Sequence, residues 1–91
     1  MPRISVVMPV FNAARFLAAS VGSVMSQTMP DWELILVDDE SSDESPSLCR
    51  EYADAFPNIH FISQKNAGPA AARNAGVRLA QGDFLFFLDA D

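Results

Sequence analysis

The sequence predicts an α/β protein with a Rossmann-like, mostly parallel sheet whose elements follow the order β-α-β-α-β-α-β. Four short apolar runs rich in β-branched and aromatic residues recur along the 91 residues, and segments with helical spacing separate them. Strands that alternate with helices of about three turns are typical of parallel strands joined by right-handed crossovers. Because no internal repeat or linker interrupts the pattern, we expect residues 1–91 to form one α/β unit.

The four apolar runs predict the strands. They lie at residues 4–8, 32–37, 60–63 and 84–88. Neither the second run nor the fourth alternates with polar residues, as a strand with one wet face would. We therefore expect both of these strands to be buried on the two faces of the sheet.

Helical spacing predicts two amphipathic helices in the first half of the chain. The first is expected to end before Pro30 and to bury one face, made of Phe16, Leu17, Val21, Val24 and Met25. The second is expected to start from the capping-prone residues Ser41, Ser42 and Asp43. It is expected to end before Pro57 and to bury Leu48, Tyr52, Ala53 and Phe56.

A third helix is predicted from about residue 69 to residue 80. Pro69 suits its first turn and Gly82 lies just past its end. The segment is rich in alanine, and such small side chains suit close packing against a sheet.

The composition excludes some functional classes. The net charge is -6 with only six Lys and Arg residues, so the chain lacks the basic stripe that binds nucleic acid. Cys49 is the single cysteine, which indicates a buried structural thiol in a reducing compartment. The first apolar run is too short for a signal sequence or a membrane span. We expect a cytoplasmic domain, with membrane association left to other parts of a longer protein.

Polar residues follow the predicted strands, at the edge where an open parallel sheet binds its ligands. These residues are 9–12, 38–42, 64–66 and 89–91. Three of the four strand ends carry acids or amides that helix capping does not fully explain. The sequence therefore predicts a ligand site at this edge.

Asp89 and Asp91 form a D-x-D pair directly after the fourth apolar run. Two such carboxylates can hold a hard cation and leave its other positions to water and phosphate oxygens, which favours Mg²⁺ or Mn²⁺ with a diphosphate. The alternative is a pair of simple turn formers, and the position at the sheet edge favours the metal. Because close carboxylates repel until a cation arrives, metal affinity should fall at acid pH.

Asp38 and Asp39 follow the second strand and have two interpretations. They can start a turn and cap the next helix, but Ser42 and Asp43 suit that purpose, which frees one of the pair for a base or ribose.

Residues 66–74 contain Gly68 and a helix start that can offer N–H groups to an anion. Arg73 either meets a phosphate or base carbonyl there or pairs with a surface acid. Phe11 is the one aromatic residue expected at the edge rather than in the core.

Four stretches together resemble the family 2 inverting glycosyltransferases of the GT-A fold. They are "ISVVMPVFN", "SVMSQTMPDWELILVDDESSDES", "NAGPAAARNAG" and "GDFLFFLDAD", in the family's order and spacing. The resemblance covers the whole chain and implies the N-terminal part of a GT-A nucleotide-diphospho-sugar transferase fold. Residues 1–91 would then be its nucleotide-sugar-binding part, ending at the D-x-D motif and lacking the acceptor-binding part.

The resemblance also implies roles for individual residues. Pro9 and Phe11 would lie beside a uracil-type base. Asp39 would form a hydrogen bond with the base or the ribose, and Arg73 would lie near the base or the phosphates. Asp89 and Asp91 would hold Mn²⁺ or Mg²⁺. The full nucleotide-binding set is Pro9, Val10, Phe11, Asn12, Asp38, Asp39, Arg73 and Ala90. Glu40 departs from the pattern, because the family usually has glycine there.

The implied activity is transfer of a sugar, with inversion, from a nucleotide-sugar donor to an acceptor hydroxyl. UDP is expected ahead of dTDP or GDP, and the acceptor would be a carbohydrate or a lipid-linked molecule, as in polysaccharide biosynthesis. The acceptor site and the catalytic base would lie beyond residue 91. We therefore expect this chain to bind nucleotide without catalysing transfer.

Several other classes share parts of this pattern. A dinucleotide-dependent oxidoreductase needs a glycine-rich turn after the first strand, and residues 9–12 contain no glycine, so this class is excluded. A P-loop NTPase is excluded because the sequence contains no P-loop motif. Haloacid-dehalogenase phosphatases and receiver domains place their acid pairs after the first strand instead. A non-catalytic nucleotide-binding or self-associating module remains an alternative, because the fourth strand should present an uncovered apolar surface and a bare edge.

Overall fold

The computed structural model describes residues 2–26 and 31–90 and confirms the predicted alternation of strands and helices. The elements are β1 (Ile4–Val10), α1 (Ala14–Met25), β2 (Trp32–Asp39), α2 (Ser45–Ala55), β3 (Ile59–Gln64), α3 (Pro69–Leu79) and β4 (Phe84–Phe87). All three strand pairings are parallel, and the sheet has the order β3-β2-β1-β4. Within the described part of the chain, no helix is long and apolar enough to cross a membrane.

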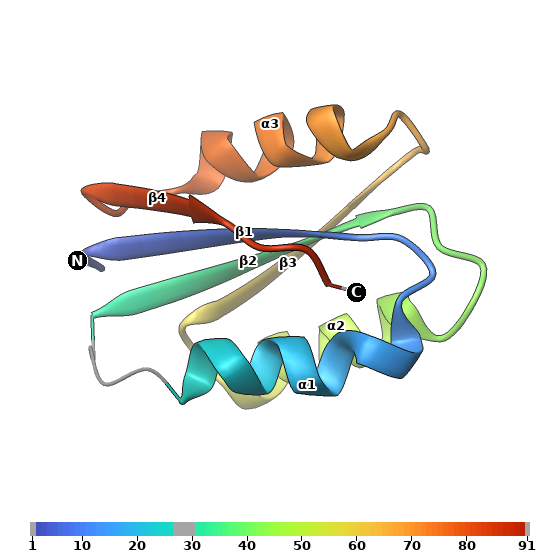
Figure 1. Ribbon diagram of the computed structural model, residues 1–91, viewed down its shortest axis with the longest axis horizontal. Helices are drawn as coiled ribbons and strands as arrows, with labels where there is room; N and C mark the ends of the chain where they lie inside the picture. Colours follow the sequence, from blue (N-terminus) through green and yellow to red (C-terminus); the bar gives the residue numbers. More distant parts are fainter. Residues whose placement is uncertain (1, 27–30, 91) are drawn as a thin grey trace.

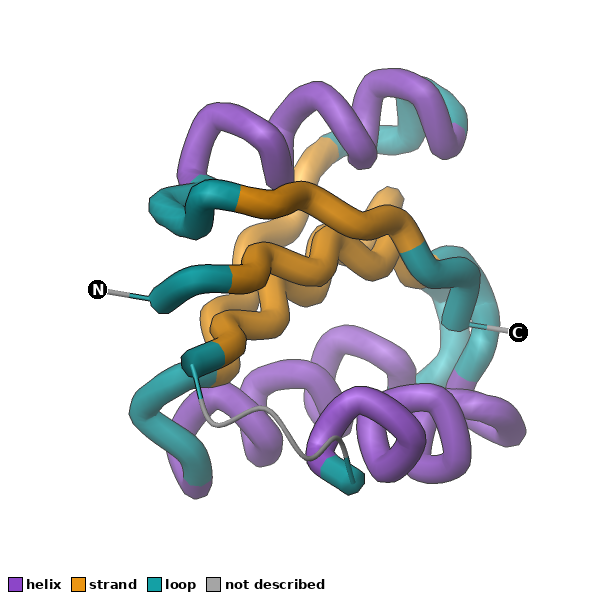
Figure 2. The backbone as a smooth tube through the Cα atoms, turned by 60° about the vertical axis from the view of Figure 1, so that its left-hand side comes forward, coloured by secondary structure: helices purple, strands orange, loops and turns teal. Residues whose placement is uncertain are grey.

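The molecule has three layers, with α1 and α2 on one face of the sheet and α3 on the other (Figures 1 and 2). The handedness of crossover connections explains this division. From β1 to β2 to β3 the chain moves in one direction across the sheet, so right-handed crossovers put both helices on the same face. From β3 to β4 it moves back past β2 and β1, so α3 lies on the opposite face.

The larger part of the core lies between the sheet and the helices α1 and α2. Leu17, Val21 and Val24 of α1 are buried there, as predicted. Phe16 was also predicted to be buried, and that prediction is wrong, because 47% of the residue is exposed. The predicted apolar residues of α2 are only half-buried, and its fully buried residues are Ser45 and Cys49.

The smaller part of the core lies under α3 and is made by Val7, Ile35, Val37 and Ala72. The predicted close packing of α3 is confirmed at Gly76. A Cβ atom placed on this glycine would collide with the side chain of Val7 on β1. Small residues therefore set how near α3 lies to the central strand.

Glu33 is a buried carboxylate on β2 that the apolar pattern of the strand did not predict. Its Oε2 accepts hydrogen bonds from Ser5 Oγ at 2.6 Å and from the backbone N–H of Gln81 at 2.7 Å. Ser5 Oγ in turn accepts one from the N–H of Gly82 at 2.8 Å. This network ties the loop between α3 and β4 to the two central strands.

The prediction that residues 84–88 are buried on both faces is wrong. Each of these residues is between 37% and 55% exposed. Among the described strands, β4 pairs with β1 alone and therefore forms an edge of the sheet. The structure thus shows the uncovered apolar edge that the sequence suggested as an alternative.

We predict that Gly76→Ala lowers the free energy of unfolding by about 1–3 kcal/mol, because the new methyl group has no space beside Val7. The matched control is Gly22→Ala, since a Cβ atom at that position in α1 meets nothing within 4 Å. Alanine there should stabilise the helix by up to about 1 kcal/mol. Urea denaturation measures both changes. Equal stability of the two variants would contradict close packing of α3.

Candidate functional site

The strands β1 and β2 run further than predicted, so Pro9, Val10, Asp38 and Asp39 are strand residues and not loop residues. The register pairs Pro9 with Val37 and Val10 with Asp38. Successive side chains of a strand point to opposite faces, so Asp38 points towards α2 and Asp39 towards α3. The register therefore gives the two neighbouring aspartates different surroundings.

Pro9 can lie inside a central strand because its missing N–H has no partner to lose. The carbonyl of Val7 accepts a hydrogen bond from the backbone N–H of Leu88, so the backbone groups of Val7 point towards β4. Pro9 lies two residues further along the strand, so its backbone points to the same side. The pairing of β4 with β1 ends at Phe87 and Val7. Pro9 thus lies beyond the last rung of that ladder.

A cleft of about 480 Å³ lies at the carboxyl ends of the strands. Its volume is typical of a small-molecule site. Seven of the residues predicted from the sequence line it: Pro9, Val10, Phe11, Asp39, Arg73, Asp89 and Ala90. Four lining residues were not in the predicted set, namely Ala13, Asn66, Gly68 and Pro69. Three of these four belong to the glycine-containing stretch before α3, which was the available signal.

Asp39 is buried and organises one wall of the cleft. Its Oδ1 accepts hydrogen bonds from Gln64 Nε2 at 3.0 Å and from the N–H of Ala67 at 2.9 Å, and its Oδ2 accepts one from the N–H of Gly68 at 3.1 Å. Burial would raise the pKa of Asp39, but these hydrogen bonds outweigh burial and lower it from the ordinary value of 3.8. The carboxylate is therefore ionised at neutral pH.

The predicted residues Asp38 and Asn12 do not line the cleft. The carboxylate of Asp38 accepts hydrogen bonds from Ser41 Oγ at 2.6 Å and from the Ser41 N–H at 3.0 Å, which closes the turn after β2. Asn12 has a φ of 48° and accepts hydrogen bonds at its Oδ1 from the N–H groups of Ser42 and Asp43. Both residues shape the loops behind the cleft.

Asp43 and Cys49 lie on the α2 side of these loops. Asp43 accepts hydrogen bonds from the N–H groups of Ser45 at 2.8 Å and Ala14 at 3.1 Å, which joins the starts of α1 and α2. Burial would raise the pKa of Asp43, but hydrogen bonding by the Ser45 side chain and by these backbone N–H groups outweighs burial and lowers it. Burial, together with the charges of Asp38 and Asp43, raises the pKa of the Cys49 thiol to about 12. Cys49 is thus the buried structural thiol that was predicted.

Asp89 and Ala90 bring the segment after β4 to the cleft. The carbonyl of Ala90 accepts a hydrogen bond from Ser20 Oγ at 2.5 Å, which anchors this segment to α1 where the chain turns towards that helix (Figure 1). Asp89 Oδ1 lies 3.9 Å from Arg73 Nη2, and the Asp89 side chain is 71% exposed. Arg73 therefore both lines the cleft and faces a surface acid. Asp91, the second residue of the D-x-D pair, lies outside the described residues.

The donor atoms of the cleft suit a metal ion that is shared with a ligand. Among the described residues, no group of three or more His, Cys, Asp or Glu could hold an ion by itself. Mg²⁺ commonly binds through one or two carboxylates and takes its remaining ligands from water and substrate phosphates. The exposed carboxylate of Asp89 at the cleft wall fits this mode of binding.

Glu40 follows Asp39 in a left-handed backbone conformation, with a φ of 59°. Glycine adopts this conformation without a steric cost, which gives a physical reason for the glycine that the resemblance implies here. In this chain a glutamate adopts that conformation. The side chain of Glu40 accepts a hydrogen bond from the backbone N–H of Asn66 at 3.1 Å.

The protein-family model for "Glycosyl transferase family 2" matches residues 5–91 of the chain. The chain belongs to this family. An uncharacterized glycosyltransferase of Haemophilus influenzae is 44% identical over 92 aligned residues, which cover 100% of this chain and 37% of the relative. The match of the family model to residues 5–91 confirms the resemblance drawn from the sequence.

Two solved structures show the same fold. Residues 1–349 of S. aureus TarS, in complex with UDP-GlcNAc, align with 28% identity and a TM-score of 0.89, covering 98% of this chain and 26% of TarS. The mannosyltransferase PcManGT from Pyrobaculum calidifontis, in complex with GDP-Man and Mn²⁺, aligns with 29% identity and a TM-score of 0.90. That alignment covers 99% of this chain and 28% of PcManGT. The chain thus has the predicted GT-A fold and spans 26–37% of the length of these relatives.

We predict that Asp39→Asn lowers the free energy of unfolding at neutral pH by about 1–3 kcal/mol, because it removes the charge and one of the two oxygens that accept from the part-buried N–H groups of Ala67 and Gly68. The pKa of Asp39 is lowered by folding, so its contribution is present above the ordinary pKa and is lost as the pH falls through the lowered value. The gap in free energy between wild type and variant should therefore be constant above about pH 5 and narrow as the pH falls below it, through the ordinary value of 3.8 and then through the lowered value.

Urea denaturation across this pH range measures the gap. The matched control is Asp54→Asn, which changes an exposed carboxylate on α2. It should alter the free energy of unfolding only slightly, and that difference from wild type should not narrow as the pH falls. A pH-independent gap for Asp39→Asn would contradict the role given to its hydrogen bonds.

Proposed function

We propose that this chain binds the donor of a glycosyltransferase, a nucleoside diphosphate sugar with UDP as the preferred nucleotide. The observation that carries the proposal is the convergence of Asp39, Arg73 and Asp89 on one cleft at the carboxyl ends of the strands. TarS in complex with UDP-GlcNAc and PcManGT in complex with GDP-Man and Mn²⁺ support it, because both share the fold of this chain.

The base and ribose are proposed to bind between β1 and the start of α3. Pro9 and Phe11 offer an apolar wall, and the residue Phe11 is 53% exposed in the cleft. The ionised carboxylate of Asp39 is an acceptor for a base N–H or a ribose hydroxyl. Gly68 and the other loop donors hold that carboxylate in place before the ligand arrives.

The diphosphate is proposed to bind beside Arg73 and the first turn of α3. No side chain caps this turn, which begins at Pro69 after Gly68, and a helix N-terminus favours an anion. Arg73 adds a guanidinium group that suits phosphate oxygens. Its contact with Asp89 is long and exposed, so the side chain can turn to a phosphate at little cost.

Asp89 and Asp91 are proposed to hold Mn²⁺ or Mg²⁺ on the diphosphate. When bound, the ion neutralises the charge of the departing nucleoside diphosphate. Ser20 and Ala90 fix the backbone next to Asp89 and so keep its carboxylate at the cleft. The complete enzyme is proposed to act with inversion, with a base that deprotonates an acceptor hydroxyl for attack on the anomeric carbon from the opposite face.

We assign no catalytic base or acceptor site to these 91 residues and propose that they bind the donor without transferring its sugar. The short span of the chain relative to its relatives supports this, since it covers 37% of the Haemophilus protein and 26% of TarS. Carbohydrate or lipid-linked acceptors would then be bound by other parts of the protein. The single buried thiol supports a reducing, cytoplasmic location.

We predict that UDP binds this protein in calorimetric titrations with Mn²⁺ and binds weakly or not at all without it. Asp89→Asn and Asp91→Asn should each weaken binding in Mn²⁺ by about 10- to 100-fold, because a metal ligand is lost. Asp83→Asn is the matched control, since Asp83 lies at the other end of β4. Arg73→Ala should weaken UDP binding by about tenfold or more, and Arg78→Ala, on the last turn of α3, should not.

Equal effects of the site and control substitutions would contradict the assignment of the cleft. A folded protein that binds neither UDP nor GDP with Mn²⁺ would contradict donor binding. Sugar transfer by the 91 residues alone would contradict the proposed lack of a catalytic base.

A second candidate, self-association through the edge of the sheet, is favoured by the exposure of residues 84–88. Phe84 and Phe86 lie on the face that α1 covers, and Leu85 and Phe87 lie on the face that α3 covers, as their pairing with β1 requires. An exposed apolar edge strand is a common site of pairing between chains. A second copy of this chain, paired at this edge, would bind the backbone groups of β4 that face away from β1.

We predict that the protein associates as its concentration rises in sedimentation velocity experiments. Phe86→Lys should shift the protein towards monomer, because a charge on an edge strand opposes pairing. Phe16→Lys is the matched control, since Phe16 is similarly exposed but lies on α1. A wild-type protein that stays monomeric at high concentration would contradict this candidate.

A further inference from the structure

The turn after β2 is held to the loop before α3 by the side chains of two consecutive acids. The backbone N–H groups of Asn66, Ala67 and Gly68 donate to Glu40 Oε1, Asp39 Oδ1 and Asp39 Oδ2 respectively, at 3.1, 2.9 and 3.1 Å. In addition, Asn66 Nδ2 donates to the carbonyl oxygen of Asp39 at 3.3 Å. Three successive amides of one loop are thus bound by two neighbouring carboxylates of another.

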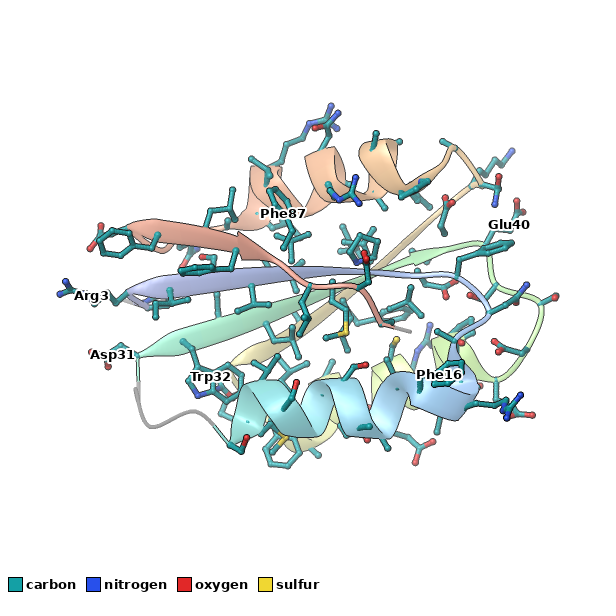
Figure 3. The ribbon with its side chains drawn as sticks, in the orientation of Figure 1. Arg3, Phe16, Asp31, Trp32, Glu40 and Phe87 are labelled. Atoms are coloured by element: carbon teal, nitrogen blue, oxygen red, sulfur yellow. The ribbon has the colours of Figure 1, made fainter. Side chains whose placement is uncertain are left out.

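The two carboxylates differ in their relation to the cleft. Asp39 lines the cleft and is buried, so a ligand that uses it as an acceptor competes with the loop donors. Glu40 does not line the cleft, is exposed, and lies just past the end of β2, away from Arg3 and Asp31 at the other end of the sheet (Figure 3). Its hydrogen bond to Asn66 can therefore persist when Asp39 binds a ligand.

Glu40 reaches this loop from a left-handed backbone conformation. At a φ of 59° the residue is in the left-handed region, which disfavours residues with a Cβ atom. The conformation persists with a glutamate whose carboxylate reaches across 26 residues of sequence to Asn66. A glycine would adopt the same turn more easily but would lack the acceptor.

We propose that Glu40 is a positioning residue for nucleotide binding, which holds the loop of Asn66, Ala67 and Gly68 at the cleft while the carboxylate of Asp39 is shared with the ligand. The inference rests on the proposed function, because the cleft is taken as the nucleotide site. The loop leads directly into Pro69 and the first turn of α3, so its position also sets that of Arg73. Loss of the bond would leave this segment to be ordered by the ligand, at a cost to affinity.

The test compares wild type, Glu40→Gly and Glu40→Gln, with thermal unfolding to show that each protein is folded. In Glu40→Gly, amide hydrogen exchange at Asn66, Ala67 and Gly68 should become faster. The Kd for UDP in Mn²⁺ should rise by about three- to tenfold, the effect of one hydrogen bond. Glu40→Gln keeps an acceptor oxygen and should return both quantities most of the way to wild type.

The matched control is Glu51→Gln, which changes an exposed glutamate on α2 outside the cleft and should alter neither quantity. Unchanged exchange in Glu40→Gly would overturn the proposal, and so would faster exchange with an unchanged Kd, because the contact would then be structural only. Absence of UDP binding to the wild-type protein would instead count against the proposed function. The exchange data would still decide whether Glu40 holds the loop.

Discussion

The carboxylate of Asp39 is the interaction on which the geometry of the cleft depends. It joins the end of β2 to the side chain of Gln64 on β3 and to the loop that starts α3, so three elements meet at one charged group. The register of β2 decides that Asp39, and not Asp38, faces this loop. A shift of one residue would exchange the two side chains between the faces of the sheet and would remove the wall of the cleft.

The opposite side of the same edge is held by side chains that bind backbone groups. Asn12 accepts hydrogen bonds from the turn before α2, and Asp43 accepts one from the start of α1. Each of these bonds joins residues that lie 29–31 positions apart in the sequence. Because both loops are fixed in this way, the residues behind the cleft shape it without touching its contents. A ligand therefore meets a site whose walls are already ordered, which lowers the entropic cost of binding.

The order of elements and most of the cleft could be predicted, because both follow from short-range patterns. Apolar runs and helical spacing locate the strands and helices, and the edge rule for parallel sheets brings Asp39, Arg73 and Asp89 together. The errors concern burial and side-chain partners. Residues 84–88 have a buried pattern, yet no described strand lies beyond β4 to cover them. The bonds of Glu33 to Ser5 and of Glu40 to Asn66 join distant residues, which no local pattern reveals.

The charges that line the cleft favour binding of the proposed ligand together with a cation. Two of the lining residues are acids, Asp39 and Asp89, and the only cationic side chain among the described lining residues is Arg73. Arg73 already faces Asp89, so a diphosphate would meet a wall that carries net negative charge. The N-terminus of α3 offsets only part of this repulsion, since a helix dipole acts as about half a charge. A divalent ion held by Asp89 would reverse the balance, because it would attract both the carboxylate and the phosphates and would leave Arg73 to the ligand.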